Sequence, residues 1–371
     1  MCSGALLHAR LDRVVFGAPE PKMGAAGSVL DVFVLPQLNH RTRITHGVLA
    51  QECAAMLTDF FQQRRREQKE RPRHPLLDTA LRPVDERFEG VTDWPWSTHW
   101  HSDLPAAKGL RLACVDEGAR SAPLTWLCIH PIPAWGYVFR HLLPVWLAAG
   151  HRVVVPDLPG FGRSDQPKKV QAHSAAWHTQ VLAQWLHTLD VQHTVLVGIG
   201  DGARLGLAAA VQQPERFVGA WLLDAWPNNI LPAAWNHWYS KASHQPGWPI
   251  GMALQELYGS QQAMPDVSAA WDAPFAHASQ RVALKAWPQV QMDWPTVPTT
   301  LLQDWLKRQR LWLTLRQQHP LLSSAHWLAA WHDAVPLLAE MPETLPHSLA
   351  HDWNLASAYN IAQQAVEYFR I

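Results

Sequence analysis

Short apolar runs alternate with stretches of helical spacing from residue 78 to the end of the chain, and this alternation constrains the fold more than any other feature. The strand-like runs are Leu124–Ile129, His151–Pro156, Thr194–Val197 and Gly219–Leu223. Strands buried on both faces read as continuous apolar runs, and strands that alternate with helices favour a parallel sheet. The sequence therefore predicts an α/β fold with a mostly parallel sheet and helices on both faces.

Length and charge narrow the class of protein. The 371 residues are enough for two domains, and a hydrophobic fraction of 48% can supply a sizeable core. Lysine plus arginine equals aspartate plus glutamate at 31 each, so any affinity for nucleic acid has to be local. No run approaches the roughly 18 apolar residues of a membrane span, and no signal peptide opens the chain. We therefore expect a cytoplasmic protein without a membrane partner.

The cysteines are too widely spaced for a disulfide framework or a complete zinc cage, both of which need cysteines at defined separations. They are Cys2, Cys53, Cys114 and Cys128. We expect all four to be reduced thiols.

A change of composition near residue 70 marks a domain boundary. The segment Glu70–Pro75 ends a charged helical stretch with two prolines, which cannot continue a helix. We predict a first domain at residues 1–73, a linker at 74–79 and a second domain at 80–371.

Three segments of the second domain are similar in sequence to a known family. They read RPVDERFEGVTDWPW, LRLACVDEGARSAPLTWLCIHPIPAWGYVFRHLLPVWLAAGHRVVVPDLPGFGRSDQP and AAWDAPFAHASQRVALKAWP. These segments resemble the haloalkane dehalogenases of the α/β-hydrolase fold, and the resemblance extends from about residue 80 to the end. Between about residues 227 and 320, proline-rich turns and tryptophans interrupt amphipathic stretches such as Thr300–Leu315. We therefore expect this segment to form a helical cap over the sheet, with Thr300–Leu315 as one of its helices.

The turn that should carry the attacking residue of such an enzyme is identifiable. In α/β hydrolases it has the pattern small-x-nucleophile-x-small, because crowding admits only small neighbours. The matching segment is Gly198-Ile199-Gly200-Asp201-Gly202, and the resemblance puts Gly200 at the nucleophile position, which is then lost. A second register makes Asp201 the nucleophile and puts Ile199 where a small residue is needed. A third interpretation of Asp201 is a carboxylate favoured by the N–H groups of a helix N-terminus.

Other candidates for the site come from the same resemblance. Asp224 follows the strand AWLLD, Asp333 lies in AAWHDAVP and His351 in LAHDW. Asp224 or Asp333 is the implied acid and His351 the implied general base, although His351 can equally be a structural histidine. His130 opens the loop that shapes the oxyanion or halide pocket in the family, and prolines stiffen that loop here. The indole that follows the nucleophile in the family is replaced by Asp201, whose charge would repel a leaving halide.

The first domain resembles a different family. The segments MCSGALLHARLDRVVFGAPEPKMGAAGSVLDV, LNHRTRITHGVLAQECAAMLTDFF and QQRRREQK resemble the C-terminal half of bacterial tRNA adenosine deaminase, which converts wobble adenosine to inosine. The resemblance implies part of a cytidine-deaminase-like α/β/α layer, a homodimer and the tRNA anticodon loop as partner. Local patterning predicts a helix at Ser3–Arg10, a strand at Arg13–Gly17 and a helix at Val48–Glu67.

Residues that would meet RNA also follow from this resemblance. Glu20 and Lys22 align with a tRNA-contacting loop, and Phe61 and Arg65 align with a contact helix. Arg64 belongs to the basic tail of that helix, which suits a phosphate backbone. Without the resemblance, the same charges would be read as a solvated helix end that complements the helix dipole.

The zinc site implied by the deaminase resemblance is incomplete. Such enzymes need a His-x-Glu and a Pro-Cys-x-x-Cys motif to hold zinc and activate a water. Only the last ligand, Cys2, is present, and a catalytic zinc needs three protein ligands. We expect this chain to bind no zinc, and we expect the missing motif to be encoded upstream of Met1.

Both parent families are hydrolases, and neither active site is complete in this sequence. The main prediction is a fragment of a fusion protein whose full-length form deaminates tRNA, with a hydrolase-like second domain that has lost its nucleophile and acts as a non-catalytic module. The alternative is an active hydrolase of the dehalogenase or esterase type that uses Asp201, or a rebuilt site with Asp224 and His351.

Overall fold

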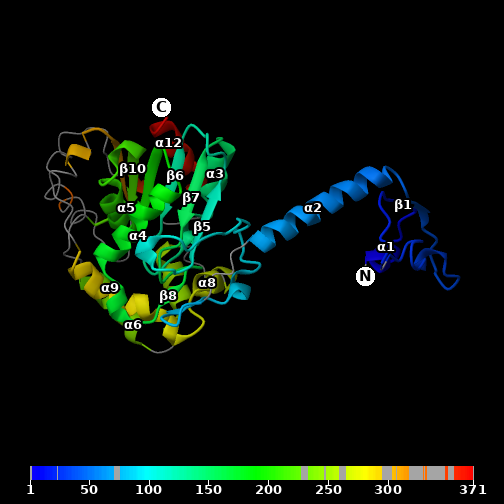
Figure 1. The fold of residues 1–371 in the computed structure, drawn as a ribbon, viewed down its shortest axis with the longest axis horizontal. Helices are drawn as coiled ribbons and strands as arrows, with labels where there is room; N and C mark the ends of the chain where they lie inside the picture. Colours follow the sequence, from blue (N-terminus) through cyan, green and yellow to red (C-terminus); the bar gives the residue numbers. More distant parts are fainter. Residues whose placement is uncertain are drawn as a thin grey trace. The chain divides into compact units, whose positions relative to one another are not determined.

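The computed structural model divides the chain into two compact units, Met1–Arg73 and His74–Ile371 (Figure 1). Each unit is described by itself. The residues that the structure describes are 2–22, 24–70, 76–226, 233–245, 248–258, 265–294, 303–305, 307–316, 329, 331, 347–349 and 355–370.

The first unit contains the three elements that the sequence predicts and one further strand, β2 (Arg43–Thr45). The predicted elements are α1 (Cys2–His8), β1 (Arg13–Val15) and α2 (Ala50–Glu70). Strands β1 and β2 pair in parallel, with Val14 opposite Ile44. Several large apolar side chains of α2 are exposed, among them Met56 and Phe60. The deaminase assignment of this unit stays a prediction.

The second unit is built on one large sheet, as the strand–helix alternation predicts. Six neighbouring strands run parallel, and the last two, β5 and β4, are antiparallel to their neighbours. In sheet order, the strands are β12 (His347–Leu349), β11 (Arg310–Arg316), β10 (Phe217–Leu223), β9 (Thr194–Ile199), β6 (Thr125–Ile129), β7 (Arg152–Pro156), β5 (Leu112–Glu117) and β4 (His99–His101). A small antiparallel pair joins β3 (Ala80–Leu81) to β8 (Gln166–Pro167).

Helices cover both faces of this sheet. Successive side chains of a strand point to opposite faces, so the contacts of neighbouring residues show which helix lies on which face. Trp126 of β6 stacks on Trp146 of α3 (Leu143–Ala148), with ring centroids 4.4 Å apart. The next residue, Leu127, points the opposite way and is level with Leu196 of β9. Leu196 lies against α5 (Asp201–Ala210), since a methyl group added at Gly206 of this helix would be 2.5 Å from the Cδ1 atom of Leu196. Helices α3 and α5 therefore pack on opposite faces.

The helices fall into two groups. Those that flank the sheet pack in pairs, α3 with α12 and α4 with α5, and those between β10 and β11 include the contacting pairs α6 with α9 and α7 with α8. Their bounds are α3 (Leu143–Ala148), α4 (Ala175–Thr188), α5 (Asp201–Ala210), α6 (Ala233–His244), α7 (Ile250–Tyr258), α8 (Pro265–Asp272), α9 (Val282–Met292) and α12 (Leu355–Tyr368). Within the described residues, no helix is both long enough and apolar enough to cross a membrane.

The expected helix at Thr300–Leu315 is wrong at its C-terminal end. Residues Arg310–Arg316 form β11, which pairs in parallel with β10 from Gly219 to Leu223. The centre of this strand, Leu311–Thr314, is buried. A short apolar run of this kind does not distinguish a central strand from a buried helix by its period. The cap ends before β11, and not at residue 320.

Two histidines near the start of α4 form a buried pair beside the cap. Nδ1 of His173 and Nε2 of His178 are 3.3 Å apart, and the ring of His178 packs edge-on against Trp287 of α9. Burial lowers the pKa of His173 to about 4 and the pKa of His178 well below its usual value. Both rings are therefore neutral near neutral pH, and one facing nitrogen donates its hydrogen to the other.

The histidine pair predicts a loss of stability in mild acid. The imidazole of an unfolded chain binds a proton near pH 6.5 and folded His173 near pH 4, so the free energy of unfolding falls as the pH drops through this window. We expect His173→Phe to reduce the fall between about pH 7 and about pH 5 by roughly 2 kcal/mol, measured by urea unfolding. A pH dependence identical to that of the parent in His173→Phe would contradict this account.

Candidate functional site

The chain turns sharply between β9 and α5, and Gly200 stands at the apex of this turn. Its backbone has φ 52° and ψ −123°, a conformation that side chains disfavour. Neighbouring glycines are also required: a Cβ at Gly198 would lie 2.4 Å from Cα of Ala203, and one at Gly202 would lie 2.3 Å from the carbonyl oxygen of His130. The small residues of the turn are thus Gly198 and Gly202, the apex is Gly200, and the apex presents no side chain.

Asp201 is the first residue of α5, and its carboxylate is enclosed by hydrogen-bond donors. Its Oδ2 atom accepts from the Tyr239 hydroxyl at 2.6 Å, Nε1 of Trp287 at 2.8 Å and Nε2 of Gln291 at 2.8 Å. Nη1 of Arg204 lies 3.8 Å from Oδ1. Only 7% of Asp201 is exposed, so the buried charge is compensated by these partners.

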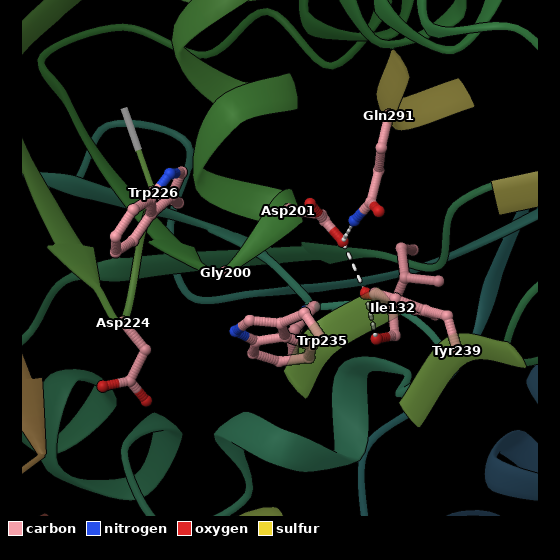
Figure 2. A pocket seen from close by; sticks show the side chains of 9 residues that line it. Ile132, Gly200, Asp201, Asp224, Trp226, Trp235, Tyr239 and Gln291 are labelled. Carbon is pink, nitrogen blue, oxygen red and sulfur yellow. Dashed lines mark hydrogen bonds between the residues drawn. The ribbon is translucent and has the colours of Figure 1, made fainter. Parts of the chain in front are cut away.

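The Tyr239 hydroxyl links Asp201 to the loop after β6. It lies 3.2 Å from the carbonyl oxygen of Ile132 and 2.6 Å from Oδ2 of Asp201 (Figure 2). One hydroxyl has a single hydrogen to donate, and the shorter distance is typical of a hydrogen bond to a charged acceptor. The Asp201 carboxylate therefore receives the stronger hydrogen bond.

Asp224 lines the same pocket from the end of β10. Its backbone has φ 49°, and its N–H donates to the carbonyl oxygen of Thr314 on β11 at 2.9 Å. Figure 2 shows the carboxylates of Asp224 and Asp201 on either side of Gly200, pointing apart. The structure places both predicted carboxylates beside the apex without bringing them together.

His130 holds the loop after β6 in place. The N–H of Leu158 donates to its Nε2 atom at 3.0 Å, so Nδ1 carries the hydrogen and donates to the carbonyl oxygen of Pro131 at 3.0 Å. Burial lowers the pKa of His130 to about 4, which keeps the ring neutral. Both nitrogens are committed to the backbone, so the geometry of His130 is that of a structural residue. The other two predicted relay residues, Asp333 and His351, lie outside the described residues.

Among the described residues, little space remains around the apex. The cavity is about 10 Å³, which is roughly what one water molecule needs. Its lining consists of Pro131, Ile132, Gly200, Asp201, Asp224, Trp226, Trp235, Tyr239 and Gln291. Sites for small organic ligands occupy roughly 300 Å³ or more. The aromatic part of the lining consists of the two indoles and the tyrosine ring.

The sequence did not reveal the partners of Asp201. Tyr239 lies on α6, and Trp287 and Gln291 lie on α9, all far from residue 201 along the chain. The available signal was indirect: a carboxylate in a tight, glycine-rich turn is buried and must find donors. Only the packing of the cap on the sheet identifies them.

The candidate RNA-binding residues of the first unit are placed only in part. Oε1 of Glu20 accepts a hydrogen bond from the N–H of Lys22 at 2.9 Å, and both side chains are exposed. Phe61, Arg64 and Arg65 lie in the C-terminal half of α2, but their side chains are outside the described residues, as is that of Cys2 in α1.

The described residues do not fit a zinc site. Among them, no group of three or more histidine, cysteine, aspartate or glutamate side chains could hold a metal ion. A catalytic zinc needs three such ligands, so we assign no step to a metal.

Comparisons with known proteins bear on the second unit. The family described as alpha/beta hydrolase fold matches residues 127–318. Haloalkane dehalogenase 1 of Mycobacterium bovis is 34% identical over 233 residues, which cover 59% of this chain and 75% of that protein. The tetrameric haloalkane dehalogenase DpaA of Paraglaciecola agarilytica NO2 superposes with a TM-score of 0.65 at 26% identity, covering 79% of this chain and 99% of its own. A thermophilic esterase from Thermogutta terrifontis shares the fold, with a TM-score of 0.56 at 19% identity. The match covers 74% of this chain and 98% of the esterase.

The tight turn predicts a steep cost for one added methyl group. In Gly202→Ala, the new Cβ would meet two backbone carbonyl oxygens, those of His130 at 2.3 Å and Ile129 at 2.4 Å, so we expect a loss of about 3 kcal/mol in urea unfolding. The control is Gly150→Ala, which has φ 80° but no atom within 4 Å of the new Cβ and should lose about 1 kcal/mol. Equal losses in the two variants would show that the turn is not crowded.

Proposed function

Because the chain belongs to the haloalkane dehalogenase family of α/β hydrolases, we propose that its second unit keeps the fold of that family without the covalent chemistry. The observation that carries this proposal is the glycine at the apex of the β9–α5 turn. Attack on a carbon–halogen bond or an acyl group needs an atom with an available lone pair on the attacking residue. Gly200 offers only backbone there.

Asp201 does not replace the missing group in this proposal. Its Oδ2 atom accepts three hydrogen bonds and its Oδ1 atom faces Arg204. A hydrogen bond to a charged group contributes about 1.5–3 kcal/mol, so freeing this carboxylate for attack would cost several kcal/mol. The small cavity also leaves no room for an alkyl chain among the described residues. The second unit then acts as a non-catalytic module.

A hydrolytic activity is the second candidate, and family membership favours it. Asp201 and Asp224 both line the cavity, so a carboxylate is present on each side of the apex. In this version, His351 would be the general base. Hydrolysis would also require a cap arrangement in which the cavity is open to a substrate.

Turnover assays separate the two candidates. The purified chain is incubated with n-butyl bromide and with p-nitrophenyl butyrate, beside Asp201→Asn, Asp224→Asn and His351→Ala. We expect bromide and nitrophenol release to equal the buffer rate in all four proteins, because no attacking atom is available. The hydrolase would be established instead if the parent released bromide or nitrophenol above the buffer rate and one of the three variants released it at least about tenfold more slowly. A dehalogenase of the same family serves as the positive control.

For the first unit, we propose local RNA binding through the end of α2. The resemblance to tRNA adenosine deaminase supports this proposal, as does the run of basic residues that includes Arg64 and Arg65 on a helix. Glu20, Lys22 and Phe61 complete the proposed surface. The homodimer, the cytoplasmic location and deamination by a longer protein stay predictions.

Fluorescence anisotropy with an anticodon stem-loop RNA tests the RNA-binding proposal. The double variant Arg64→Ala/Arg65→Ala should bind about tenfold more weakly and lower the salt slope by roughly 1 to 2, because two fewer cations meet the phosphates. The matched control, Lys307→Ala/Arg308→Ala, removes two exposed cations from the second unit and should change neither quantity. Equal affinity of both double variants would remove the proposal.

A further inference from the structure

Three neutral donors from the cap converge on one oxygen atom of Asp201. The Tyr239 hydroxyl comes from α6, and the Trp287 indole and the Gln291 amide come from α9. All three side chains are buried, with 1%, 0% and 2% of their surface exposed in that order. Their distances to Oδ2, from 2.6 to 2.8 Å, lie within the range of strong hydrogen bonds.

Donors that point at a single position in a buried site create a place for a negatively charged atom. Each of the three groups donates a hydrogen to Oδ2, so each stabilises a negatively charged acceptor at this position. Arg204, 3.8 Å from Oδ1, adds a positive charge on the other side. Without a charged acceptor, three buried donors would lose a strong partner together, which is costly.

We propose that Tyr239, Trp287 and Gln291 form a binding site for a small carboxylate anion, and that the chain's own Asp201 occupies this site as a built-in ligand. The carboxylate joins the first turn of α5 to α6 and α9, and so holds these two cap helices against the sheet. The proposal does not depend on whether the second unit is catalytic, because it concerns binding.

The proposal predicts that the built-in ligand can be replaced by a free one. The side chain of aspartate is a methylene group with a carboxylate, so acetate carries the same heavy atoms. Asp201→Gly removes those atoms and leaves their space beside the existing cavity of about 10 Å³. Acetate should enter that space and restore the three hydrogen bonds. In Asp201→Asn the amide fills the same space, so acetate should have no place to bind.

Thermal unfolding with increasing sodium acetate, at ionic strength held constant with the bulky anion gluconate, tests this directly. We expect a saturable rise in the Tm of Asp201→Gly by several degrees, and no rise for the parent or for Asp201→Asn. Equilibrium dialysis with labelled acetate should give one bound anion per chain in Asp201→Gly and none in the parent. Adding Trp287→Phe to Asp201→Gly should weaken acetate binding about tenfold, because one donor is lost.

Absence of any acetate-dependent stabilisation and binding in Asp201→Gly would overturn the proposal. If that variant does not fold, Asp201→Ala with formate supplies the same carboxylate beside a retained methyl group. Recovery of folded protein with formate but not with gluconate supports the site, and failure with both anions counts against it. Bromide or nitrophenol release is not a readout here, so these results are separate from the turnover assays.

Discussion

The turn between β9 and α5 is the constraint on which the site depends. The backbone at Gly200 leaves the strand and enters the helix within one residue, at a φ of 52°. Carbonyl oxygens of the neighbouring strand end press against Gly202, and the N–H of Gly200 donates to the carbonyl oxygen of Leu223 on β10 at 2.9 Å. The geometry that presents an attacking side chain in α/β hydrolases is thus complete in the backbone. The residue that occupies it has no side chain to present.

The next residue explains what the turn does in this protein. Asp201 points from the start of α5 into the cap, where a charge can remain only if donors surround it. Tyr239, Trp287 and Gln291 supply those donors and connect the sheet layer to α6 and α9. In the function we propose, two neighbouring positions account for the site: Gly200 offers no attacking atom, and Asp201 is a buried anchor for the cap. The cavity left between them is about 10 Å³.

The parts of this structure that could be predicted from sequence are those that local patterning determines. Strands β6, β7, β9 and β10 follow continuous apolar runs. The sequence left two registers open for the glycine-rich turn, and the structure places Gly200, not Asp201, at its apex. Strand β11 was not predicted correctly, since a run such as Leu311–Thr314 has no period that separates it from a buried helix. The donors to Asp201 could not be predicted, because they come from helices far along the chain. The sequence places His130 in a loop, but it does not show the hydrogen bond from the N–H of Leu158, because that segment folds back onto the loop from 28 residues away.

The central claim is that no atom of this site forms a covalent bond to a substrate. Incubating the chain with n-butyl bromide in water enriched in the heavy oxygen isotope, followed by mass spectrometry of peptides that contain Asp201 and Asp224, tests it most directly. A carboxylate that attacks carbon and is released by water exchanges its oxygen at each turnover, so even slow chemistry accumulates label. The account predicts peptide masses identical to those of a control without the bromide. Incorporation of heavy oxygen into either carboxylate would contradict it.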